Sequence, residues 1–327
     1  MTISLCMIVR NEAELLPRAL TDWRALADEL LIADTGSDDN TVNIATRLGA
    51  RVLHYEWAYP GNKGAARNVG LDAAASEWIV ILDADEIIQD APGLRATLLE
   101  QDLPVDGLDV HFQNYTEYNQ MSMQWTQLRI FRRGLFRYKH REHELPFAVG
   151  AARLGTISTV FEHRPPAGRE PGKLQPMLDR LMLDVLEQPD DPHPLYFLHR
   201  QYLLAGDYIR SIELGQQFLA MPGNLDRCEC YGNLANAYLR TDRPVEAIKM
   251  YHNALVEQPE RRVWWIRLAE VYMVHGNYHL ALTLLRCAAE LRLNEQEQNY
   301  QPELATVHLY NLIEHCQMHL AGHQHEH

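Results

Sequence analysis

Asp83 and Asp85 lie two residues apart, directly after an apolar run at residues 78–82. Carboxylate oxygens are the ligands that Mg²⁺ and Mn²⁺ prefer in proteins, and two carboxylates at this spacing can hold one such ion. The ion could bridge two phosphates of a nucleotide and stabilise the charge of a departing diphosphate. An Asp-x-Asp pattern is weak by itself, because it also occurs in loops and at helix starts. It predicts a metal site only where other polar residues converge on it.

Polar side chains also follow two earlier apolar runs. Residues 3–9 are followed by Arg10, Asn11 and Glu12, and the run at residues 30–33 ends at Asp34. In an open parallel sheet, ligands bind outside the carboxyl ends of the strands, so these side chains would share one edge with the aspartate pair. Crowded carboxylates repel one another, and a bound cation with a phosphorylated ligand would relieve that repulsion. The alternative is structural, since Asn11 and Asp34 could cap helices.

A basic segment from residue 128 to residue 144 is the second candidate for chemistry. Arg129 or Arg132 could neutralise a diphosphate, because a guanidinium fork matches phosphate oxygens. His143 could be a third metal ligand or could orient Glu144, and His163 is the rival for the metal. Glu144 is our choice of general base, with Glu86 and Asp85 as alternatives. A basic strand balanced by solvated glutamates is the bland interpretation.

The elements that must position these residues alternate between strand and helix patterns. Short apolar runs at residues 3–9, 30–33, 51–55 and 78–82 are separated by helical patterns at 12–26, 41–48 and 64–75. This alternation predicts crossover units and a parallel sheet. From residue 107 to 161 the runs become shorter and richer in aromatic residues, which favours antiparallel strands that complete the sheet. Proline and glycine then predict a linker at residues 166–173.

Beyond the linker the sequence is helical and repeats itself. Tyr202, Tyr238 and Tyr272 are 36 and 34 residues apart, and nine residues after each stands a small residue, at Ser211, Ala247 and Ala281. A period of about 34 residues with small residues where helices cross resembles the tetratricopeptide repeat. We therefore expect a first domain over residues 1–165, a helical repeat domain over 174–320 that begins with a leading helix, and a histidine-rich tail at 321–327.

Composition excludes several classes of protein. The 327 residues carry a net charge of −14, which makes a nucleic acid an improbable partner, although residues 129–141 are locally basic. No apolar stretch predicts a membrane-spanning helix, and the first residues do not resemble a secretory signal. The five cysteines form no CxxC pair and are interpreted as reduced thiols, so we expect a cytoplasmic protein.

Four blocks in order, at residues 9–12, 31–37, 64–68 and 82–86, resemble those of family-2 glycosyltransferases of the GT-A fold. The likeness is strongest to the branch with tetratricopeptide repeats, which includes relatives of the peptide S-glycosyltransferases and lipopolysaccharide-core glucosyltransferases. The resemblance implies that Asn11 and Glu12 line the base pocket, that Asp34 binds uracil or ribose, and that Arg67 lies near the base and phosphates with Asn68 supporting its loop. It implies a nucleotide-sugar site formed by Arg10, Asn11, Glu12, Asp34, Arg67, Asn68, Asp83 and Ala84.

The resemblance also implies the reaction. It is sugar transfer from a UDP-sugar with inversion, assisted by Mn²⁺ or Mg²⁺ bound by Asp83, Asp85 and His143. We expect Glu144, Arg129 and Arg132 to act in catalysis. The concave surface of a repeat array favours a peptide or protein acceptor. Transfer to a cell-surface glycan or to a modified DNA base is the alternative, and a non-catalytic adaptor with a decayed nucleotide-sugar fold is the rival from another class.

Overall fold

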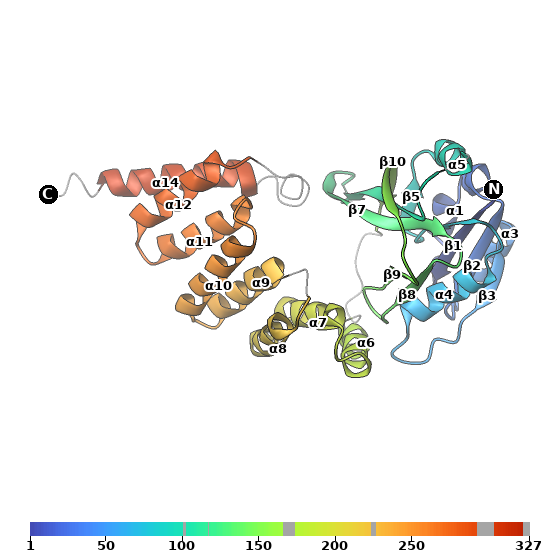
Figure 1. Ribbon diagram of the computed structural model, residues 1–327, viewed down its shortest axis with the longest axis horizontal. Helices are drawn as coiled ribbons and strands as arrows, with labels where there is room; N and C mark the ends of the chain where they lie inside the picture. Colours follow the sequence, from blue (N-terminus) through green and yellow to red (C-terminus); the bar gives the residue numbers. More distant parts are fainter. Residues whose placement is uncertain (101–102, 117, 166–173, 224–226, 293–303, 323–327) are drawn as a thin grey trace. The chain divides into compact units, whose positions relative to one another are not determined.

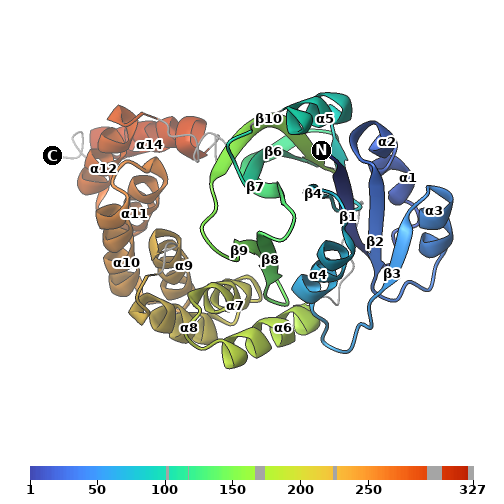
Figure 2. The same cartoon turned by 45° about the vertical axis from the view of Figure 1, so that its right-hand side comes forward.

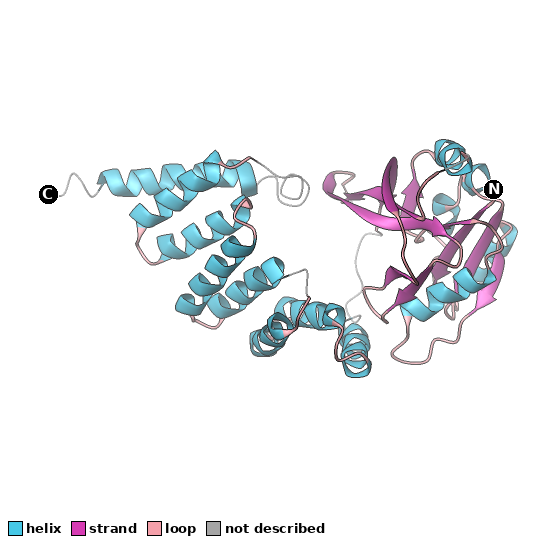
Figure 3. Ribbon diagram, in the orientation of Figure 1, coloured by secondary structure: helices cyan, strands magenta, loops and turns pink. Residues whose placement is uncertain are grey.

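The computed structural model describes residues 1–100, 103–116, 118–165, 174–223, 227–292 and 304–322. The chain divides into two compact units, Met1–Asp184 and Val185–His327. The first combines a sheet with helices, and the described part of the second is helical throughout (Figures 1 and 3). The predicted fold class, an α/β domain with a mostly parallel nucleotide-binding-type sheet followed by an all-α repeat domain, is confirmed.

Eight strands form the main sheet, in the order β3-β2-β1-β4-β7-β6-β10-β5. Its parallel half contains the four predicted strands, β1 (Ile3–Val9), β2 (Glu29–Asp34), β3 (Arg51–His54) and β4 (Trp78–Ile81). Its other half contains β5 (Glu86–Ile88), β6 (Gly107–Tyr115), β7 (Met121–Arg132) and β10 (Leu154–His163). A separate hairpin is formed by β8 (Phe136–Lys139) and β9 (Leu145–Ala148).

Three details differ from the prediction. The strands at 107–161 are not all antiparallel: β7 is antiparallel to β4 and β6, but β10 runs parallel to β6. The short strand β5 follows the acidic loop directly and pairs with β10. The helix expected over residues 12–26 is two short helices, α1 (Leu16–Ala19) and α2 (Trp23–Leu26), because the chain turns at Leu20–Asp22, where the Thr21 hydroxyl bonds the carbonyls of Pro17 and Arg18.

Side chains that alternate along the strands fill two cores, one on each face of the sheet. On one face Leu5 and Val80 pack with α1, α2, α3 (Thr41–Arg47) and α5 (Ala91–Leu99). On the other face Cys6 and Ile81 pack with α4 (Lys63–Ala73) and with the β8–β9 hairpin. Covering both faces leaves the carboxyl-terminal edge of the parallel strands available for polar side chains.

The helical unit consists of successive hairpins (Figure 2). Its helices are α7 (Pro192–Leu204), α8 (Tyr208–Ala220), α9 (Arg227–Arg240), α10 (Pro244–Glu257), α11 (Arg262–Val274), α12 (Tyr278–Glu290) and, after the π-helical turn η1 (Leu304–His308), α14 (Leu309–Gly322). The predicted small residues Ser211, Ala247 and Ala281 are fully buried where helices approach. The period read from the sequence therefore marks equivalent positions in three helix pairs.

The limits of the domains need a different description from the one we expected. The linker at 166–173 and residues 323–327 of the tail lie outside the described residues. The predicted leading helix is α6 (Leu174–Glu187), and the division between the units falls inside it, so most of α6 belongs to the first unit. The domain limits 1–165 and 174–320 remain a proposal. Within the described residues, no helix is both long and apolar enough to cross a bilayer.

Candidate active site

The loops that follow β1 and β2 are joined by hydrogen bonds. Asn11 has a left-handed backbone with φ 56°, its amide donates to Ser37 Oγ at 2.9 Å, and its Oδ1 accepts from the amide of Asp38 at 2.9 Å. Buried Asp34 accepts from the amides of Gly36 and Ser37. The loops expected to bind the base are therefore held together by hydrogen bonds. The side chains of Asn11 and Asp34 both accept from backbone amides.

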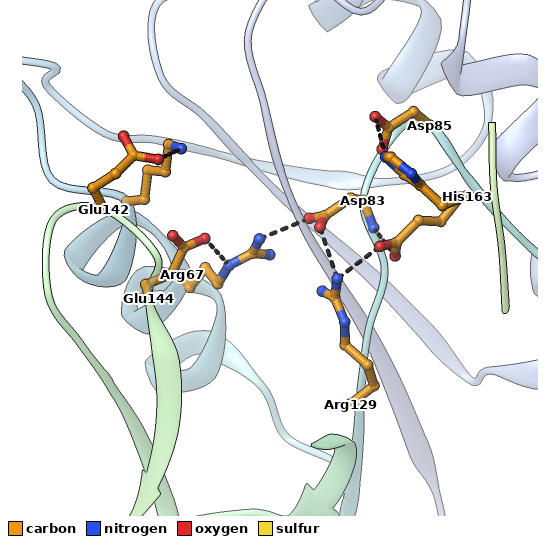
Figure 4. A network of polar contacts seen from close by, with 9 residues as sticks. Arg67, Asp83, Asp85, Arg129, Glu142, Glu144 and His163 are labelled. Carbon is orange, nitrogen blue, oxygen red and sulfur yellow. Dashed lines mark hydrogen bonds and ion pairs between the residues drawn. The ribbon is translucent and has the colours of Figure 1, made fainter. Parts of the chain in front are cut away.

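Asp83 is held between two arginines at the end of β4 (Figure 4). Its Oδ1 accepts from Arg67 Nη2 at 2.8 Å, and its Oδ2 accepts from Arg129 Nη2 at 3.0 Å. Burial alone would raise the pKa of Asp83, but the two guanidinium groups outweigh it and hold the pKa well below its usual range. Asp83 is therefore an ionised carboxylate whose oxygens are both paired.

Glu86 lies beneath this pair and supports the acidic loop. Its Oε1 accepts from Arg129 Nη2 at 2.6 Å, and its Oε2 accepts from the amide of Asp83 at 2.9 Å. The side chain is almost completely buried, and this burial raises its pKa to about 7 against the attraction of Arg129. With both oxygens bonded and almost no exposed surface, Glu86 supports the position of Asp83.

Asp85 faces a histidine that is aligned from behind. His163 Nε2 lies 3.1 Å from Asp85 Oδ2, and His163 Nδ1 lies 2.6 Å from Asn114 Oδ1. The Asn114 amide is oriented by its Nδ2, which donates to Ser122 Oγ at 2.7 Å. Because Asn114 Oδ1 and the Asp85 carboxylate are both acceptors, this arrangement favours the form of His163 that has a proton on each nitrogen. Desolvation alone would lower the pKa of His163, but its bond to Asp85 raises it.

Glu144 joins the same charged group from the β8–β9 loop. Its Oε1 accepts from Arg67 Nε at 2.8 Å, so Arg67 connects Glu144 to Asp83 (Figure 4). Asn68, one residue further along α4, bonds the backbone of Tyr138 through both ends of its amide. The structure thus brings Glu144, Arg67, Asp83 and Arg129 into one cluster, and Asn68 supports the hairpin beside it.

The predicted metal ligands do not form a ready three-ligand set. Among the described residues, no group of three or more His, Cys, Asp or Glu side chains is arranged to hold a metal ion. The reason is that Asp83 is paired with arginines and Asp85 with His163. Of the two histidines considered for the metal, His143 lies in the loop before Glu144 with φ 52°, and His163 is the one in contact with Asp85.

The remaining predicted residues, Arg132, Arg10, Glu12 and Ala84, are not part of the charged cluster. Arg132 pairs across the sheet with Trp78, at the opposite end of β4 from Asp83, and forms an ion pair with Glu77. Arg132 therefore does not lie at the acidic edge, where its predicted catalytic role would require it. The side chain of Arg10 is exposed, that of Glu12 is half-buried beside the Asn11 loop, and Ala84 is buried between the two aspartates.

Several residues near the cluster escaped the sequence analysis. Asn114 is one of them: it is the direct partner of His163 on the parallel pair β6–β10, a register that sequence does not reveal. Glu142 is buried in ion pairs with Lys63 and with Arg180 of α6. Asp184 of α6 binds Arg141 through its amide and its guanidinium. The sequence did contain a signal for these contacts, because Arg180 and Asp184 lie among the leucines that form the buried face of α6.

Residues 4–158 match the family model described as glycosyl transferase family 2. The chain is 55% identical over 84 residues to a TPR repeat-containing protein of Synechococcus elongatus, which covers 26% of this chain and 20% of that protein. It is 38% identical over 85 residues to an uncharacterized glycosyltransferase of Rickettsia felis, which covers 26% of this chain and 29% of that protein. The matches thus span less than a third of either relative.

Among solved structures, Staphylococcus aureus TarS 1–349 in complex with UDP-GlcNAc superposes with a TM-score of 0.45 at 14% identity, over 79% of this chain and 92% of that one. Residues 4–158 of this chain are thus similar to glycosyl transferase family 2, and the helical hairpins of the second unit follow this part of the chain.

Proposed function

We propose that the protein is a metal-dependent glycosyltransferase that moves a sugar from a UDP-sugar. The observation that carries the proposal is the convergence of Asp83, Asp85, Arg67, Arg129 and His163 at one edge of the sheet, in a domain that matches family 2. Gathering so many charges at one partly buried edge is costly, and such clusters concentrate at sites that bind charged ligands.

The residues at this edge fit a divalent cation. Asp85 and His163 face each other, and Asn114 already accepts the Nδ1 proton, so a cation can replace the Nε2 proton. Mn²⁺ or Mg²⁺ bound there would neutralise the leaving diphosphate. Asp83 becomes available to the ion or to the ribose when its arginines turn to phosphate oxygens.

The two arginines keep unused hydrogen-bonding capacity for such phosphates. Arg67 Nη1 and Arg129 Nε are buried and have no hydrogen-bond partner among the described residues. Buried donors without partners are rare in proteins, and a diphosphate supplies the acceptors that they lack. Arg129 is therefore our choice for stabilising the departing charge.

Glu144 is our choice of general base for a single displacement that inverts the anomeric carbon. As the bond from acceptor to sugar forms and the bond to UDP breaks, Glu144 takes the acceptor proton. Arg67 holds one oxygen of Glu144 and so fixes its direction. Asp85 would be occupied by the metal, and Glu86 is buried beneath Arg129.

A peptide or protein acceptor suits the helical repeats, whose stacked pairs offer an extended surface. A cell-surface glycan is the second choice, and a modified DNA base is the third because of the net charge of −14. A cytoplasmic location remains a prediction.

Donor hydrolysis tests the proposal without knowledge of the acceptor. Purified protein with Mn²⁺ is given UDP-glucose, UDP-galactose and UDP-N-acetylglucosamine in turn, and free UDP is measured. We expect release from at least one donor, loss with EDTA, and a fall of about 10²-fold in Asp85→Ala. Asp72→Ala, which removes an exposed carboxylate paired with Arg137, is the matched control. Equal rates with EDTA and in Asp85→Ala would instead favour the adaptor.

A further inference from the structure

The loop between β8 and β9, residues 140–144, carries Glu144 and is held in an unusual backbone conformation. His140 and His143 have φ of 68° and 52°, in the left-handed region that non-glycine residues seldom occupy. Such conformations persist only where surrounding contacts determine them. We therefore asked which elements hold this loop.

One support is the amino-terminal end of α4. The amides of Lys63 and Gly64 donate to the carbonyls of Arg141 and His140, each at 3.2 Å. A Cβ atom added at Gly64 would lie 2.6 Å from the His140 carbonyl oxygen, so only glycine permits this approach. These bonds seat one side of the loop but leave its charged side chains to other partners.

The other support is α6, which follows the matched family domain. Arg180 donates to Glu142 Oε2 through Nε at 2.7 Å and lies 2.6 Å from it through Nη2, while its Nη1 donates to the Pro60 carbonyl at 2.7 Å. Glu142 also pairs with Lys63. One guanidinium thus joins the 140–144 loop to the segment that leads into α4.

Asp184, one helical turn after Arg180, is a second residue of α6 that contacts the 140–144 loop. Asp184 is fully buried, accepts from the Arg141 amide at 2.6 Å through Oδ2, and accepts from Arg141 Nη1 at 2.8 Å through Oδ1. A buried carboxylate that binds both backbone and side chain of one residue fixes that residue firmly. Arg180 and Asp184 therefore hold Glu142 and Arg141, the two residues between the left-handed histidines.

We propose that α6 is part of the catalytic apparatus, with Arg180 and Asp184 as positioning residues that keep the 140–144 loop where Glu144 meets Arg67. The inference rests on the proposed function, and it extends the working unit beyond the matched residues 4–158 to Asp184. It predicts that the backbone of residues 140–144 becomes more mobile when either Arg180 or Asp184 is replaced.

The test uses the full chain and compares Arg180→Ala, Arg180→Lys and Asp184→Asn. Three quantities are measured: the rate of UDP release from the active UDP-sugar, the Kd of UDP with Mn²⁺, and hydrogen exchange of the amides of residues 140–144. Arg210→Ala, which breaks an exposed arginine–aspartate pair in α8, is the matched control. Arg180→Lys keeps the charge but loses the fork, so it should restore part of the effect.

We expect Arg180→Ala to lower the release rate by about 10²-fold and to speed loop exchange by about tenfold, while the Kd of UDP stays within about threefold. Loop exchange equal to that of the control in the soluble variants would overturn the inference, as would faster exchange with an unchanged rate. If Arg180→Ala is insoluble, Arg180→Lys and Asp184→Asn decide the same questions. Absence of UDP release from the unaltered protein would refute the proposed function, whereas loop exchange would still show whether α6 holds the loop.

Discussion

The two units of this molecule differ in where they place their ion pairs. In the first, Arg67, Arg129, Glu86, Glu142 and Asp184 are all buried and paired. In the second, the pairs Arg210–Asp207, Arg243–Glu246 and Arg267–Glu270 join residues three apart in sequence outside the core, and buried Arg261, which pairs with Glu229, is an exception. The core of the second unit is formed mainly by alanines and large apolar residues.

The location of the buried ion pairs calls for an explanation other than packing. Taking a charged pair out of water costs about as much as the pair returns, so packing alone gives no reason to bury one. The helices of the second unit pack mainly through apolar contacts, and small residues at the crossings allow the helices to approach closely. The first unit keeps its costly cluster at the carboxyl-terminal edge of its parallel strands, the edge at which open sheets of this kind generally bind ligands.

Removal of Arg129 should give the largest effect on stability. Arg129→Ala leaves the buried carboxylate of Glu86 without its guanidinium partner and removes one of the two arginines that pair with half-buried Asp83, so the free energy of unfolding should fall by about 3–5 kcal/mol. Urea unfolding followed by circular dichroism measures it. Arg137→Ala, at an exposed pair with Asp72, should cost less than about 1 kcal/mol. Equal losses in the two variants would erase the contrast between buried and exposed pairs.

Much of this arrangement could be predicted from sequence because it depends on local patterns. Continuous apolar runs identified β1, β2 and β4, and the order of polar residues after them placed Asp34 and Asp83 at one edge. Small residues at a fixed period identified the helix crossings at Ala247 and Ala281.

What sequence did not reveal depends on register and on distant partners. Arg129 lies where the register of β6 and β7 shifts, and Arg132 pairs with Trp78 at the start of β4, so these two arginines of one strand lie at different distances from Asp83. The pairing of His163 with Asn114 requires the parallel register of β6 and β10. The contacts of α6 with the 140–144 loop were not evident from sequence, because the same helix carries Val185, which packs against the core of the repeats.

Overpacking a helix crossing should damage the second unit alone. Ala247 is fully buried, so Ala247→Leu should destabilise the repeats by about 1–3 kcal/mol while UDP release from the first unit stays unchanged. Val245→Leu, at an exposed position of the same helix, is the control and should be neutral. Thermal unfolding and donor hydrolysis measured on the same samples check this, and lost hydrolysis would contradict the division of labour.

Acid should weaken the hold of α6 on its loop. Desolvation would raise the pKa of Glu142, but Lys63 and Arg180 together lower it below the ordinary value. Because the pKa is lower in the folded state, this stabilisation is present above the unfolded pKa and is lost as the pH falls through the folded pKa. Hydrogen exchange of residues 140–144, corrected for intrinsic rates, should therefore rise below about pH 4.5. In Glu142→Gln the loop should exchange faster at neutral pH and respond less to acid; identical profiles would contradict the role of this carboxylate.

The smallest effect is expected at the surface of the repeats. Arg243→Ala removes an exposed pair with Glu246 and should change the free energy of unfolding by no more than about 0.5 kcal/mol. Urea unfolding beside Arg129→Ala measures the contrast directly. A loss above about 2 kcal/mol would show that surface charge stabilises the repeats after all.

The central claim, a cation and a diphosphate held together at the acidic edge, is tested most directly by calorimetric titration of UDP with Mn²⁺ and with EDTA. We predict that Mn²⁺ tightens UDP binding at least about tenfold in the unaltered protein and that Asp85→Ala loses this gain. UDP affinity that is the same with and without the metal would contradict the account.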